Sequence, residues 1–263
     1  MTDRHTLVLE IDPSSLRAMA QAGSRTIVAK HCGDRKLVVA WLAWEPSARD
    51  TVVWEESYGL FAAGTAQDGV ALRLLAVVDH AIDGALYPFS GSGFGRPQLR
   101  ANIPPGHYEI QNDAPFALTF GLVQAAAING RLRRSPMHAV GVGPGNPVDF
   151  APMTTISVWT EGGVEIGSIV RVPPYATTIT FHAARRVERC LYDPDGRRFV
   201  PAVRRRSLES ERRPRPPLEW ARRTPTTCMA LRKRGKSCLG KLVSTSSRWR
   251  NSATTAAAAP ALR

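Results

Sequence analysis

The composition of this chain changes abruptly after Val203, and that change limits what the chain can fold into. Residues 1–203 contain 19 Lys and Arg and 19 Asp and Glu, whereas residues 204–263 contain 16 basic and 3 acidic residues. The formal net charge of +13 therefore lies entirely in the second segment. All eight Phe and all five Tyr occur at or before Phe199, so the second segment lacks most of the large side chains that fill a core. We expect a folded domain over residues 5–203 and a disordered Arg/Pro/Ala-rich tail over residues 204–263.

The basic tail has three interpretations. As a disordered arm it would bind nucleic acid or another polyanion by releasing counterions, which would make the protein nucleic-acid-associated. As a folded module it would bind nucleic acid through defined contacts. Its mixture of Arg with Pro, Ser, Thr and Ala is also what a GC-rich coding sequence gives in a wrong frame, in which case the tail is frame-shifted or unselected sequence. The tail alone therefore assigns no function.

One short helix is expected near the N-terminus, and its signals are local. Asp12 or Ser14 can cap its first turn, and Gly23 can end it in the left-handed conformation. Its length by this pattern is about nine residues. Its expected apolar stripe consists of Leu16, Met19 and Ala20.

Short strands dominate the rest of the neutral part. Two β-branched and aromatic runs, LVVAWLAWEP and TVVWEESYGLFAAG, are separated by residues 46–50, which have the composition of a hairpin loop. The sequence RCLYDPDGRRFVPA predicts a final hairpin, and the Gly/Pro-rich segments YPFSGSGFGRPQ and GVGPGNPVDFAP predict loops between strands. Further strands are expected at residues 7–11, 26–30, 71–78, 107–111, 118–126, 155–159, 168–172 and 177–182. The pattern predicts a mainly β fold, an antiparallel β-sandwich with one short N-terminal helix.

No motif identifies a catalytic or metal site. Glu55 and Glu56 are neighbours on an expected strand, so they point to opposite faces and cannot act together on one sugar. Asp79 and His80 have residue types found in hydrolase triads, but no nucleophile-elbow motif accompanies them. The six His never recur at the spacing of a local metal pair, and the four Cys form no CxxC motif. We predict no catalytic residue, no cofactor and no metal; a hydrolase using Glu56 or His80 stays open as an alternative.

Aromatic residues give the sequence argument for ligand binding. Trp41 and Trp44 are three positions apart, so on one strand they would face opposite sides of the sheet. One of them would then leave the core and be exposed, unless a second layer, a helix or an oligomer partner covers it. Exposed aromatic rings can stack on sugars or enter the interfacial region of a bilayer. We therefore predict a non-enzymatic binding module for a carbohydrate or a lipid surface, as in lectin-like or toxin-like sandwiches. The predicted ligand-binding residues are Trp44, Trp54, Glu56 and Tyr58.

The N-terminus and the cysteine count bear on location. MTDRHTLVLEID contains no apolar stretch typical of a signal peptide, and no window of the sequence is apolar over the length needed to cross a bilayer. The cysteines are too few for a disulfide framework. These features predict a cytoplasmic protein, with export by a route that needs no signal peptide and oligomerisation both left open.

Overall fold

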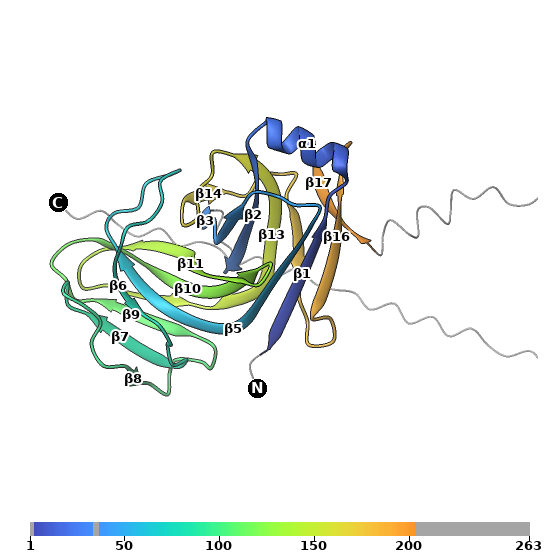
Figure 1. Ribbon diagram of the computed structural model, residues 1–263. Helices are drawn as coiled ribbons and strands as arrows, with labels where there is room; N and C mark the ends of the chain where they lie inside the picture. Colours follow the sequence, from blue (N-terminus) through green and yellow to red (C-terminus); the bar gives the residue numbers. More distant parts are fainter. Residues whose placement is uncertain (1–2, 34–36, 203–263) are drawn as a thin grey trace, which may run out of the picture. The chain divides into compact units, whose positions relative to one another are not determined.

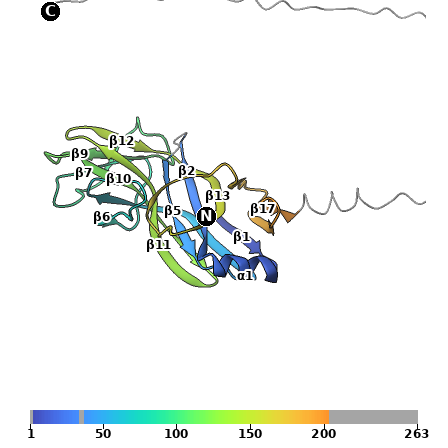
Figure 2. The ribbon, with the colours of Figure 1, turned by 90° about the horizontal axis from the view of Figure 1, so that it is seen from above.

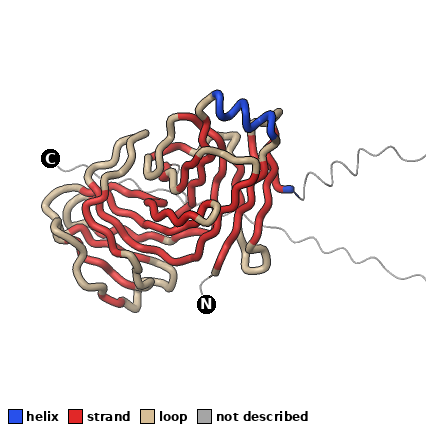
Figure 3. Tube along the Cα trace, in the orientation of Figure 1, coloured by secondary structure: helices blue, strands red, loops and turns tan. Residues whose placement is uncertain are grey.

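β-Strands make up most of the part of the chain that the structure describes, and they form curled sheets. The computed structural model describes residues 3–33 and 37–202, and the predicted tail at residues 204–263 lies outside the described residues. Within the described part, strands follow one another over most of the trace and one short helix lies at one end (Figure 3). The predicted β-sandwich with a short N-terminal helix is confirmed.

The largest sheet is strongly curved, and its longest strand follows that curve (Figure 1). In spatial order its strands are β11 (Arg131–Val142), β10 (Leu118–Ile128), β5 (Arg49–Ala63), β1 (Arg4–Glu10), β16 (Val187–Asp193) and β17 (Arg198–Pro201), and β6 (Leu74–Val78) also pairs with β5. Its pairings are antiparallel except that of β1 with β16. The sheet therefore joins the first strand of the domain to its last hairpin.

Three smaller sheets complete the domain, and Figure 2 shows them from above. One contains β12 (Pro147–Phe150), β9 (Tyr108–Asn112), β7 (Ala85–Phe89) and β8 (Gln98–Leu99); the next contains β15 (Thr177–Thr180), β13 (Pro152–Gly162), β2 (Ser24–Cys32) and β4 (Leu42–Trp44); the last pairs β14 (Ile169–Arg171) with β3 (Leu37–Val39). The first of these includes a parallel pair, β7 with β9. One large cluster of buried apolar side chains connects the main sheet with the two four-stranded sheets, and its burial is the main source of stability.

The helix α1 (Pro13–Gln21) forms where its capping signals are. Asp12 is the N-cap and accepts hydrogen bonds from the backbone N–H groups of Ser14 and Ser15, at 3.0 Å each. Gly23 follows the helix with φ +61°, the left-handed conformation that glycine adopts without strain. The predicted stripe needs one correction: Met19 and Ser15 are buried, whereas Ala20 is exposed.

The run LVVAWLAWEP is not one strand, and this changes its partners. It divides into β3 and β4, which are separated by Ala40 and Trp41. β4 pairs with β2, while the next strand, β5, pairs with β1 and β10, so the predicted hairpin at residues 46–50 is wrong. Because the strand is interrupted, the alternation argument for Trp41 and Trp44 also fails: Trp41 is fully buried and Trp44 is half-buried against the same core.

Other strands appear where the sequence favoured loops or gave no prediction. β7 and β12 overlap the two Gly/Pro-rich segments, and β11 is a long strand that contains Pro136. Proline cannot donate a ladder hydrogen bond and is tolerated at edges and bulges. β11 is an edge strand, and its register with β10 shifts next to Pro136, which explains how the strand accommodates it. The predicted final hairpin forms as β16 and β17.

Over residues 3–33 and 37–202, no helix combines the length and the apolar character needed to span a membrane. Cys32 and Cys190 are buried in the same described part. Burial raises the pKa of the Cys190 thiol to about 12.

Candidate functional site

A buried lysine lies at the centre of a polar cluster inside the core. Lys30, on β2, is 0% exposed. Its Nζ atom donates to Glu56 Oε1 at 2.9 Å and Oε2 at 2.6 Å, to the Tyr58 hydroxyl at 2.9 Å and to Gln124 Oε1 at 3.1 Å. The ammonium group also lies 4.9 Å from the centre of the Tyr58 ring. We call Lys30, Glu56, Tyr58, Gln124 and Trp54 the lysine cluster; it connects β2 with β5 and β10.

A bulge in β5 brings the acidic member of the lysine cluster inward. Trp54 and Tyr58, four positions apart, lie opposite Ala126 and Gln124, only two positions apart on β10. The extra residues of β5 bend the strand, as bulges do. Gln124 Nε2 donates to the Glu55 carbonyl oxygen at 2.7 Å, which satisfies a carbonyl group within the bulge.

Each polar atom of the Glu56 carboxylate has partners. Trp54 Nε1 donates to Oε1 at 3.0 Å, the Tyr58 hydroxyl donates to Oε2, and His5 Nε2 lies 3.4 Å from Oε1. Burial lowers the pKa of Lys30 to about 8 although the Glu56 carboxylate opposes this change. Burial, together with the same carboxylate, raises the pKa of Tyr58 far above its ordinary value, while burial lowers the pKa of His5.

Three of the four predicted ligand-binding residues come together in this cluster. Trp54 is 2% exposed and Tyr58 is 6% exposed, while the Glu56 side chain is 16% exposed. Trp44 is half-buried on β4, next to Thr26 of β2. The expectation that these rings are exposed for stacking is therefore wrong for Trp54 and Tyr58, because the second sheet covers that face of β5. A role in ligand binding itself stays a prediction.

The two residues of the hydrolase alternative lie on opposite faces of the large sheet. His80 lines a cavity of about 340 Å³, together with Arg4, Glu55 and Arg134. Glu56 points the other way, into the lysine cluster. Because β5 separates them, Glu56 and His80 do not form one site, and a hydrolase that uses one or the other stays a prediction.

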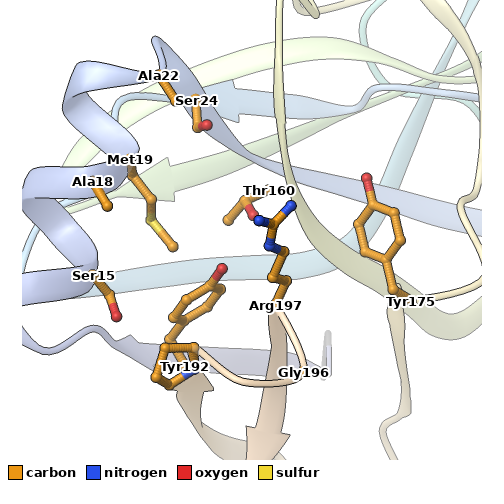
Figure 4. Close-up of a pocket in the computed structure, with 11 residues that line it drawn as sticks. Ser15, Ala18, Met19, Ala22, Ser24, Thr160, Tyr175, Tyr192, Gly196 and Arg197 are labelled. Atoms are coloured by element: carbon orange, nitrogen blue, oxygen red, sulfur yellow. The ribbon is translucent and has the colours of Figure 1, made fainter.

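Another pocket opens elsewhere, between α1, β13 and the β16–β17 hairpin. Its volume is about 560 Å³, which falls within the usual range for small-molecule sites. In Figure 4 the guanidinium group of Arg197 extends beside Thr160 into the space between Tyr192 and Tyr175, and Met19 of α1 lies on another side. We call this the hairpin pocket. It combines aromatic faces, hydroxyl groups and a cation.

The two tyrosine side chains of the hairpin pocket differ in how far other residues pack against them. The Tyr192 ring packs edge-on against Phe199, with ring centres 5.4 Å apart, so the core supports it. Tyr175 is 41% exposed, and partial burial raises the pKa of its hydroxyl group. A tyrosine hydroxyl that stays protonated both donates and accepts hydrogen bonds. The pocket can therefore present ring faces and hydroxyl groups to the same ligand.

The hairpin pocket was not predicted from the sequence, although two of its walls, the helix and the final hairpin, were. The helix and the final hairpin were expected from local signals, but nothing in the sequence indicates that they lie next to each other. Contact between them follows from the parallel pairing of β1 with β16, strands far apart in the chain. The one local feature that could have indicated a ligand site is Tyr192 followed by a turn that contains Arg197.

Among the described residues, no three His, Cys, Asp or Glu side chains gather closely enough to hold a metal ion. Comparison of the chain with protein-family models, with curated proteins and with solved structures finds no match.

Proposed function

We propose that this protein is a non-enzymatic binding module that takes a carbohydrate in the hairpin pocket. The observation that carries the proposal is the combination, in one open pocket, of two tyrosine rings with the hydroxyl groups of Ser15, Ser24 and Thr160. Sugars present both apolar ring faces and many hydroxyl groups, so they need aromatic surface and hydrogen-bonding groups together.

The size and the chemistry of the pocket support a small ligand that is bound rather than transformed. A volume of about 560 Å³ holds one or two sugar rings. The described residues that line it include serines and tyrosines but no His, Cys, Asp or Glu that could act as a general base for them. A recessed pocket can enclose a single sugar ring, whereas the surface of a bilayer is flat and cannot enter it.

The proposal is tested with the full-length chain and a panel of neutral and acidic mono- and disaccharides. At least one sugar should raise the melting temperature, because a ligand that binds only the native state stabilises it. The Tyr175→Ala variant should bind that sugar about tenfold more weakly, since it loses one ring face.

The matched control is Phe116→Ala, which removes another exposed aromatic side chain outside the pocket. Its affinity should stay within about twofold of the original. If no sugar binds, or if Tyr175→Ala binds as well as the original chain does, the proposed function is wrong. Binding to phosphatidylcholine vesicles alone would support the lipid surface that the sequence left open.

A further inference from the structure

We infer that the hairpin pocket selects an acidic sugar, whose anionic group binds Arg197 while Ser15 donates to another oxygen of the same ligand. This inference rests on the proposed function and names the class of its ligand. It is carried by two polar side chains that line the pocket and make no hydrogen bond of normal geometry within the described residues.

The first of these side chains is the cation. Three arginines that precede it have carboxylate partners: Arg185 pairs with Glu188, Arg186 with Asp3 and Arg189 with Glu10. Within residues 3–33 and 37–202, the exposed side chains of Arg197 and Arg198 form neither an ion pair nor a hydrogen bond, and of the two only Arg197 lines the pocket. It is also the one charged residue among the described residues that line the pocket. A guanidinium group matches the geometry of a carboxylate, so it is suited to bind one.

The backbone at Arg197 takes the left-handed conformation, which a glycine at this position would adopt without strain. Arg197 has φ +48°, whereas its neighbour Gly196 does not take a positive φ. The left-handed conformation is costly for a residue with a Cβ atom and is natural for glycine. Strained conformations are often found at binding sites. The turn therefore keeps an arginine, aimed into the pocket, at the position where glycine would fit best (Figure 4).

The second unpartnered side chain is Ser15, on the first turn of α1. It is 7% exposed and lines the hairpin pocket. Its Oγ atom lies close enough to the Asp12 carboxylate to help lower the pKa of that group, yet it makes no hydrogen bond of normal geometry with any described residue. A buried hydroxyl without a partner is costly, and an acceptor oxygen of a ligand would satisfy it.

Both unpartnered groups can donate hydrogen bonds, and both therefore need an acceptor. An anionic acceptor suits the side of the pocket at Arg197, which is the one charged residue among the described lining residues, whereas the Asp12 carboxylate lies next to Ser15 outside the lining. Asp193 and Asp195 belong to the same turn but do not line the pocket. The two tyrosine rings can then stack on the sugar ring, and Thr160 can form hydrogen bonds with the sugar hydroxyl groups. The arrangement thus fits a sugar that carries a carboxylate.

The test compares glucuronic acid with glucose, which differ only in having a carboxylate in place of a hydroxymethyl group. Binding to the full-length chain is measured by calorimetry at physiological ionic strength. Glucuronate should bind at least about tenfold more tightly than glucose, as expected for one charge-assisted contact.

The decisive variant is Arg197→Gly, because it removes the guanidinium group and also relieves the left-handed strain. It should reduce glucuronate affinity to about that of glucose and should not lower the melting temperature, so that loss of binding cannot be attributed to unfolding. The matched control is Arg198→Ala, which removes one positive charge from the next residue. Arg198 does not line the pocket, and this variant should keep the preference for glucuronate.

The outcomes separate the inference from the proposed function. If neutral sugars bind and glucuronate has no advantage, the selection for acidic sugars is wrong while the carbohydrate module stands. If neither binds, both are overturned. If Arg197→Gly weakens binding to phosphatidylserine vesicles and glucuronate does not bind, the anionic ligand is a lipid headgroup and the assignment to sugars is wrong.

Discussion

The lysine cluster and the hairpin pocket use similar side chains for opposite purposes. Each combines tyrosine with a cationic side chain, and the lysine cluster adds tryptophan. In the lysine cluster every donor of Lys30 is directed at a protein acceptor, and the cluster is covered by a second sheet. In the hairpin pocket the cation and a buried hydroxyl have no partner within the described chain.

This difference indicates which region is structural and which is available to a ligand. A satisfied buried ion pair has used its interactions inside the protein, so removing one member leaves an uncompensated charge. A buried donor without a hydrogen bond costs stability unless something binds to it, and an exposed cation such as Arg197 is hydrated and free to exchange water for a ligand. We therefore expect substitutions in the lysine cluster to change stability strongly, and substitutions in the hairpin pocket to change affinity.

The largest effect is expected from Glu56→Ala. This substitution leaves the fully buried Lys30 ammonium without its carboxylate, and it should lower the free energy of unfolding by about 3–5 kcal/mol. Urea denaturation measures the change. Glu55→Ala is the matched control: it removes the neighbouring carboxylate, which is exposed on the other face of β5, and should cost less than about 1 kcal/mol. Equal losses in the two variants would contradict the contrast between the two faces of β5.

A smaller effect is expected from pH, and its sign follows from Lys30. The pKa of Lys30 is about 8 in the folded protein and 10.5 in the unfolded chain. Between these values the unfolded chain binds more protons, so the contribution of Lys30 to stability rises with pH, by up to about 1.4 kcal/mol per pH unit. It is lost as the pH falls through about 8.

The measurement is the difference in unfolding free energy between the original chain and Lys30→Met, followed from pH 7 to about pH 9.5. The difference isolates Lys30 from other groups, such as Tyr58, that titrate at alkaline pH. A difference that does not change over this range would show that Lys30 keeps its ordinary pKa and that the cluster is open to water.

The smallest effect is expected from Ser15→Ala, and it has the opposite sign. Removing a buried hydroxyl that lacks a partner should raise the free energy of unfolding by about 0.5–1 kcal/mol. Ser14→Ala is the control, because the Ser14 hydroxyl donates to the Asp12 carboxylate of the helix cap; this variant should lose about 0.5 kcal/mol. Thermal denaturation distinguishes the two signs. A destabilised Ser15→Ala would mean that Ser15 has a structural partner.

Features set by neighbouring residues could be predicted, and those set by distant residues could not. The cap at Asp12, the left-handed Gly23 and the β16–β17 turn depend on a few adjacent residues, and each forms as expected. The partner of β4 depends instead on packing against β2, and turn composition at residues 46–50 carries no information about that. The long edge strand β11 was missed because its three arginines and Pro136 resemble a loop.

The candidate sites show the same limit. The alternation from Val52 to Leu60 correctly predicted that Trp54, Glu56 and Tyr58 share the apolar face of β5. It could not predict that Lys30 from another sheet would pair with Glu56, because no local pattern links the two positions. For the same reason the hairpin pocket, which combines residues from α1, β13 and the last hairpin, has no signature in any one segment.

The most direct test of the whole account is a nuclear magnetic resonance titration of the full-length chain with glucuronic acid. We predict that the backbone amide signals of Gly196 and Arg197 shift with increasing ligand, because these residues line the hairpin pocket. The indole N–H signals of Trp41 and Trp54, which donate to Gln124 and Glu56, should stay in place. Shifts of the two indole signals with unchanged signals in the turn would contradict the account, since they would place the ligand at the lysine cluster.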